Sequence, residues 1–165
     1  MKISKTKYIS YLAMFTLVAL GLSYLEGLIP PLTSIPGIKL GLANLAVIFA
    51  LYKFGVKSAF VVSLMRVFIS FLLFGSVLSL AYSFSGALFS ITVMAIMKKS
   101  GKFSEIGVSV AGATAHNIAQ ILVAVLIFSV SEILYYLPVL MISAVISGIF
   151  IGITGAVTVR RIKIK

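Results

Sequence analysis

The sequence contains no cysteine and no aspartate, and its only acidic residues are Glu26, Glu105 and Glu132. Without cysteine there is no disulfide, and a single histidine, His116, cannot build a zinc site. Enzymes that act on diphosphates usually hold magnesium through aspartate carboxylates, so such an active site cannot be assembled from this chain. No phosphate-binding loop is present, and we expect no catalytic residue, metal or cofactor.

Apolar residues dominate what remains. They make up 61% of the 165 residues, whereas charged residues make up 10% and the mean hydropathy is +1.22. A bilayer-spanning helix needs about 20 mostly apolar residues. The sequence therefore predicts an all-α integral membrane protein, a single domain over residues 1–165 with six transmembrane helices in a compact bundle. The expected spans are 8–28, 39–53, 56–75, 76–97, 105–129 and 134–159, the first of them retained rather than cleaved.

The net charge of +11 comes from basic residues that gather between alternate spans. In a six-span path they all fall on one side of the membrane, which the positive-inside rule makes cytoplasmic. Both termini are then cytoplasmic, and no folded basic surface is left for a nucleic acid. These residues are Lys2, Lys5, Lys7, Lys53, Lys57, Lys98, Lys99, Lys102, Arg160, Arg161, Lys163 and Lys165.

Arg66 is the basic residue that the topology does not explain, because it lies near the centre of the third span. A lone arginine at that depth costs about 2.5–3.5 kcal/mol on insertion scales, so it should face a partner or a wet cavity. At a similar depth the fifth span carries His116, Asn117 and Gln120 in "AHNIAQ". These side chains either join helices by hydrogen bonds or form a binding site with Arg66, and we favour the site.

A second polar group is expected nearer the outer surface, at "SIPGIKLGLANLAV", residues 34–47. Lys39 and Asn44 open the second span there, and a helix N-terminus beside a lysine favours an anion. The alternative is a helix start softened by glycine. Glu26, at the end of the first span, either pairs with Lys39 or holds a ligand group. With Tyr82 in the outer half of the fourth span, these residues predict a pocket that opens outward.

Small residues repeat every four positions along the last span, where helices in lipid can approach closely. They are Ala144, Gly148, Gly152 and Ala156. The stripe either packs within the bundle, which we favour, or docks another protein. Glu105 is expected to open the fifth helix, where a carboxylate suits the helix dipole, and Glu132 to lie in an outer turn.

Several motifs resemble the heptaprenyl diphosphate synthase component I family, also called the Gx transporter family. They are "PGIKLGLANL", "LMRV" around Arg66, "FSGALFSITVMAIM", "GVSVAGATAHNIAQ" and "YYLPVLMISAVISGIFIG", and the likeness extends from the first span to the last. The family is similar to the substrate-binding S components of energy-coupling factor transporters, which are six-helix proteins with an outward pocket. Those components carry an Ala-x-x-x-Ala docking motif in the first helix, whereas Ala13 and Ala19 here are six residues apart.

Two functions follow from the residues and the resemblance. The first is a non-catalytic membrane protein that binds a small anionic or amphipathic substrate, such as an isoprenoid phosphate or a vitamin-like cofactor. Its partners would be membrane lipid and the transmembrane and ATPase subunits of an energy-coupling factor module. The second is a membrane subunit that anchors a soluble polyprenyl diphosphate synthase.

Overall fold

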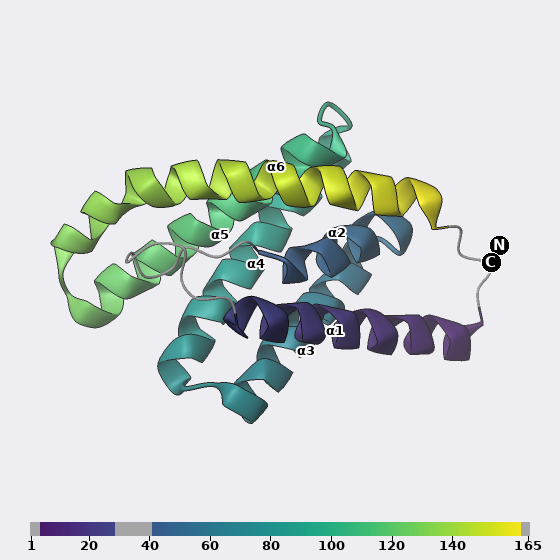
Figure 1. Cartoon of the computed structure of the whole chain (residues 1–165), viewed down its shortest axis with the longest axis horizontal. Helices are drawn as coiled ribbons and strands as arrows, with labels where there is room; N and C mark the ends of the chain where they lie inside the picture. The colour runs from purple at the N-terminus through teal and green to yellow at the C-terminus, as the bar shows by residue number, and fades with distance from the viewer. Residues whose placement is uncertain (1–3, 29–40, 163–165) are drawn as a thin grey trace.

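The computed structural model describes residues 4–28 and 41–162, and all their regular structure is helical. Figure 1 shows long helices packed side by side, with a shorter one, α2, among them. The elements are α1 (Lys5–Leu28), α2 (Ala43–Lys53), α3 (Val56–Phe74), α4 (Val77–Ser100), α5 (Glu105–Phe128), the 3-10 helix η1 (Ser131–Tyr136) and α6 (Leu137–Arg161).

Five of these segments are long and apolar enough to cross a membrane, namely α1, α3, α4, α5 and η1 with α6. Large apolar side chains cover their outer faces, as Leu17 and Leu126 do with exposed fractions of 64% and 77%. Such a surface suits lipid rather than water. The segments agree with five of the predicted spans, so a helical membrane bundle is confirmed.

The predicted second span is different. Its helix, α2, has 11 residues and is about 16 Å long, which is short of the roughly 30 Å hydrocarbon core. The first residues of the predicted 39–53 span lie outside the described ones. The six-span path and the cytoplasmic placement of both termini therefore stay predictions.

Helix α2 is the most buried part of the bundle. Val47, Ala50 and Leu51 have no exposed surface, and Phe49 is 1% exposed. The ring of Phe49 stacks on that of Phe15 in α1 with 4.7 Å between their centroids. Because the short helix is enclosed by longer ones, its first turn lies inside the protein, where it contributes to the site described below.

The small-residue stripe of α6 lies against α5. A Cβ atom added to Gly148 would be 2.7 Å from Val110 Cα, and one added to Gly152 would be 2.7 Å from Ile106 Cα. Any side chain at these positions would therefore push the two helices apart. Ala144 is also buried, so these three residues pack within the bundle.

The bundle has one basic end. Helix α1 begins and α6 ends at the same end of the molecule (Figure 1). There Tyr8 of α1 bonds Ser58 of α3 at 2.7 Å, and Lys98 of α4 donates to the carbonyl of Leu51 in α2. Other lysines and arginines of the described residues flank the same helix ends: Lys5, Lys7, Lys53, Lys57, Lys99, Lys102, Arg160 and Arg161. The polar residues of the site lie farther along the helices, toward the opposite end.

Candidate functional site: a polar cavity inside the helix bundle

Arg66 supplies the positive charge of the site from the middle of α3. Its Nη1 donates a hydrogen bond of 3.0 Å to Ser23 Oγ in α1, while its buried Nε makes no hydrogen bond with the part of the chain that the structure describes. Among the described residues, the one ion pair with a nitrogen–oxygen distance within 4.0 Å joins Arg160 to Glu105. The guanidinium of Arg66 is thus held by a neutral hydroxyl and is not neutralised by a carboxylate in contact.

Glu26 closes the site at the start of α2. Its Oε1 accepts a hydrogen bond of 2.5 Å from the backbone N–H of Gly41, and its Oε2 accepts one of 3.2 Å from that of Leu42. A carboxylate suits the positive end of a helix dipole, so the predicted anion position holds a side chain of this chain itself. Gly41 has a φ of +73°, which disfavours any residue with a Cβ atom. Lys39 lies outside the described residues.

The amide and imidazole groups come from α5. The ring of His116 lies over Gly86 of α4, where an added Cβ would be within 2.6 Å of a ring atom. Asn117 Nδ2 donates to the carbonyl of Leu140 in α6 at 2.9 Å, so this side chain joins two helices. Gln120, one turn after His116, lines the same space and makes no hydrogen bond with the other described residues.

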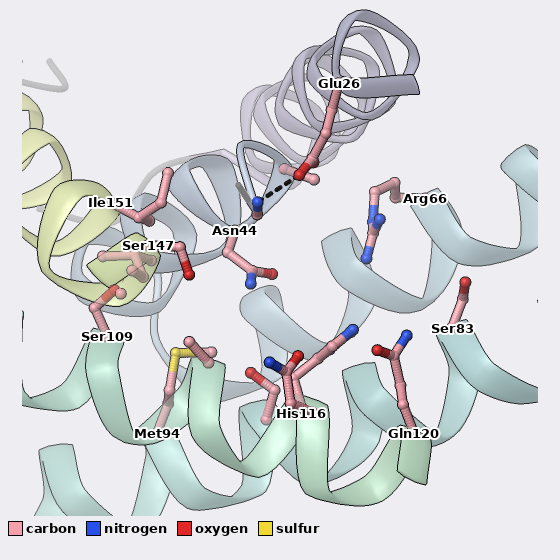
Figure 2. A pocket seen from close by; sticks show the side chains of 17 residues that line it. Glu26, Asn44, Arg66, Ser83, Met94, Ser109, His116, Gln120, Ser147 and Ile151 are labelled. Carbon is pink, nitrogen blue, oxygen red and sulfur yellow. Dashed lines mark hydrogen bonds between the residues drawn. The ribbon is translucent and has the colours of Figure 1, made fainter. Parts of the chain in front are cut away.

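These side chains line one small cavity of about 80 Å³ between α1 and α6. Figure 2 shows Arg66 and Asn44 pointing into it from one side, with His116 and Gln120 facing them. The sequence-predicted residues that the structure brings together here are Glu26, Asn44, Arg66, His116, Asn117 and Gln120. We call this space the polar cavity.

The observed lining of the polar cavity differs from the expected site in two ways. Tyr82 does not line the polar cavity but stands in a neighbouring apolar cleft between α4, α5 and η1. The next residue, Ser83, does line the polar cavity, together with hydroxyl groups that we did not predict as site residues, those of Ser90, Ser109 and Ser147. Ser90 Oγ is buried without a hydrogen-bond partner among the described residues. Serine is common where helices pack in lipid, so its presence alone does not indicate a site.

The polar groups of this cavity are of kinds that form hydrogen bonds and carry positive charge. It offers one guanidinium together with amide, imidazole and hydroxyl groups, which can hold an anion or a polar head group. The described residues contain no group of three or more histidine, cysteine, aspartate or glutamate side chains placed to hold a metal ion. The arrangement therefore provides charge and hydrogen bonds for recognition and no set of carboxylates for metal-assisted diphosphate chemistry.

Comparison with known families agrees with the resemblance seen in the sequence. The family model described as heptaprenyl diphosphate synthase component I matches residues 15–158, which is most of the chain. The matched range contains every described residue of the polar cavity. No curated protein and no solved structure matches the chain.

Proposed function

Since the chain belongs to the heptaprenyl diphosphate synthase component I family, we propose that it is a non-catalytic membrane protein that binds a small anionic or amphipathic molecule. In this proposal it resembles the S component of a transporter, and the polar cavity is its substrate site. An isoprenoid phosphate fits the family's name, and a vitamin-like cofactor is the other candidate ligand.

The observation that supports this proposal most strongly is that the guanidinium of Arg66, whose Nε is buried, lies beside the cavity without a charged partner in contact in the described part of the chain. A charged side chain is costly to hold within a membrane protein, and it usually faces a charged partner or a wet cavity. Arg66 faces the polar cavity, and among the described residues it bonds to Ser23 while its buried Nε has no hydrogen-bond partner. An anionic group of a ligand would supply both the missing hydrogen bonds and the missing counter-charge.

The other side chains would orient the ligand. Gln120 and His116 face Arg66 across the cavity, and Asn44 points into it from the same side as Arg66 (Figure 2). Glu26 would act through α2, because its carboxylate fixes the first turn of the helix that carries Asn44. Asn117 would hold α6 in place through Leu140. Lys39 would add a charge at the rim, and Tyr82 would contact the ligand only outside the polar cavity.

The distribution of basic residues indicates from which side of the membrane a ligand would reach the polar cavity. The basic end of the bundle faces the cytoplasm under the positive-inside rule, so the half that contains Glu26 and Arg66 faces outward. The ligand would be captured from outside the cell. Because the chain has no phosphate-binding loop for ATP, translocation would need transmembrane and ATPase subunits of the energy-coupling factor kind, or a rearrangement of the bundle.

Mass spectrometry of small molecules retained after mild purification tests this function. Wild-type protein should retain an anionic compound, and Arg66→Gln should lose it. Arg161→Gln is the matched control, because it removes the same charge from an exposed residue at the basic end. Retention of the same compound by Arg66→Gln would refute the assignment of the polar cavity as the anion site.

The family's name supports a second function. Component I of a heptaprenyl diphosphate synthase implies a second component, and a soluble synthase would bind at the cytoplasmic end. Affinity purification from native membranes separates the two proposals. A soluble polyprenyl diphosphate synthase recovered in equal amount supports the anchoring role, whereas ATPase subunits support transport.

A further inference from the structure

The polar cavity is too small to hold a whole ligand. Its volume is about 80 Å³, whereas sites for drug-sized molecules measure roughly 300–1,000 Å³. A cavity of this size can hold a few water molecules or one compact charged group. A ligand of Arg66 that is larger than such a group must therefore extend beyond this cavity.

A larger cavity adjoins it on the side of η1. This cavity measures about 560 Å³ and lies between the start of α4, the end of α5, η1 and the start of α6. We call it the α4–α5 cleft. Ser83 and Gln120 line both the polar cavity and this cleft, so the two spaces meet at these residues. Most of its remaining wall surface is apolar and includes Leu78, Ile121, Ala124, Phe128, Ile133 and Leu140, with Ser76, Ser79, Tyr82 and Tyr136 among them.

A third cavity, the α1–α3 cleft, meets the polar cavity at Arg66 and Ser83. It measures about 330 Å³. Polar groups that do not line the α4–α5 cleft are spread along it, namely Ser23, Ser70 and the guanidinium of Arg66. A hydrocarbon chain placed there would cover these hydroxyls and lose their hydrogen bonds to water, which costs free energy. The α4–α5 cleft is both larger and more apolar, so it suits such a chain better.

We propose that the ligand is a single-chain amphiphile whose compact anionic head binds Arg66 in the polar cavity and whose apolar chain lies in the α4–α5 cleft. The chain passes between Ser83 and Gln120, where the two spaces meet. This inference rests on the proposed binding function and adds the second part of the ligand to it. Prenyl monophosphates have this chemistry, and geranyl monophosphate, with its short branched chain, is a suitable probe.

The test measures equilibrium binding of geranyl monophosphate to the full chain in phosphatidylcholine nanodiscs. All variants are measured with the same prenyl probe. Partitioning of that probe into the bilayer is then the same in every measurement, so differences in affinity come from the variants. Ala124→Phe and Leu78→Trp each place a larger side chain in the α4–α5 cleft. Ser70→Phe does the same in the α1–α3 cleft and is the matched control. Inorganic phosphate is the probe without a chain.

Both variants of the α4–α5 cleft should weaken binding of geranyl monophosphate by about tenfold or more, as expected when several chain carbons lose their site. Binding of inorganic phosphate should be unchanged, which also shows that the variants are folded. Ser70→Phe should leave the affinity for both probes unchanged.

Three results would overturn this inference while leaving the proposed function intact. The first is unchanged affinity for geranyl monophosphate in both variants of the α4–α5 cleft. The second is loss of affinity in Ser70→Phe alone. The third is that the purified protein retains a two-chain phospholipid which geranyl monophosphate does not displace. If neither probe binds the wild type, or if Arg66→Gln binds both probes as the wild type does, the proposed function fails as well.

Discussion

Arg66 Nη1 donates a hydrogen bond of 3.0 Å to Ser23 Oγ, so the third helix is joined to the first through a neutral hydroxyl. A carboxylate at the position of Ser23 would have neutralised the guanidinium. The hydroxyl orients Arg66 and leaves its charge to act on the polar cavity. In a site of low dielectric such a charge interacts strongly with an anion. Under the proposed function, this pair holds the cation in position for an anionic ligand.

Glu26 is expected to stabilise the fold by binding the start of α2. Glu26→Ala removes the acceptor for the N–H groups of Gly41 and Leu42, and it should lower the free energy of unfolding by about 1–3 kcal/mol. Glu132→Ala is the control, because Glu132 is exposed in η1. Thermal unfolding of both variants in detergent checks this. Equal stability of Glu26→Ala and the wild type would contradict the capping role.

Replacement of two glycines by alanine should change the stability of the protein in opposite directions. Gly41→Ala should destabilise the protein by about 1–2 kcal/mol, because its φ of +73° is unfavourable for alanine. Gly21 lies within α1 and an added Cβ would have no neighbour within 4 Å, so Gly21→Ala should be neutral or stabilising by about 0.5–1 kcal/mol. The same unfolding measurement applies. A neutral Gly41→Ala would show that the left-handed conformation is not needed there.

Gly152 tests whether the small-residue stripe of α6 serves the bundle itself. Gly152→Ala would place a Cβ 2.7 Å from Ile106 Cα, and overpacking of this kind costs about 1–3 kcal/mol. Gly107→Ala is the control, since its nearest neighbour would be 3.7 Å away. The melting temperature of the isolated protein should fall for Gly152→Ala alone. If Gly152→Ala is stable but no longer binds a partner, the stripe is a docking face.

The lengths of the helices could be predicted well because long apolar runs are bounded by polar or turn-forming residues. Ser104 illustrates this, since its side chain accepts the N–H of Gly107 at 3.2 Å and α5 begins at Glu105 as expected. The brevity of α2 could not be predicted in this way. Its apolar residues are buried by neighbouring helices rather than exposed to lipid, and hydropathy does not distinguish these two surroundings.

Much of the site could be predicted from the depth of each residue in the membrane. In a helix that spans the membrane, this depth follows from the number of residues between that position and the end of the helix. Arg66, His116 and Gln120 line one cavity for this reason. Rotation about the helix axis is harder to predict. Adjacent helical residues point about 100° apart, so Ser83 lines the polar cavity whereas Tyr82 lines the α4–α5 cleft only.

The orientation in the membrane is a separate prediction. Reporter fusions after Lys102 and after Lys165 should both report a cytoplasmic location, because the basic residues gather at that end of the bundle. A reporter inserted at Glu132, exposed in η1, should report an external location. An external signal after Lys102 would contradict the orientation and place the polar cavity nearer the cytoplasm.

The central claim is that Arg66 binds the anionic group of a ligand, and a comparison of two ligands tests it most directly. Geranyl monophosphate and geraniol share a chain and differ in charge. Arg66→Gln should weaken binding of geranyl monophosphate by about tenfold or more, the loss expected for a charge-assisted hydrogen bond of about 1.5–3 kcal/mol. It should leave geraniol binding unchanged, and Arg161→Gln should affect neither ligand. Equal losses for both ligands, or no loss for geranyl monophosphate, would contradict the claim.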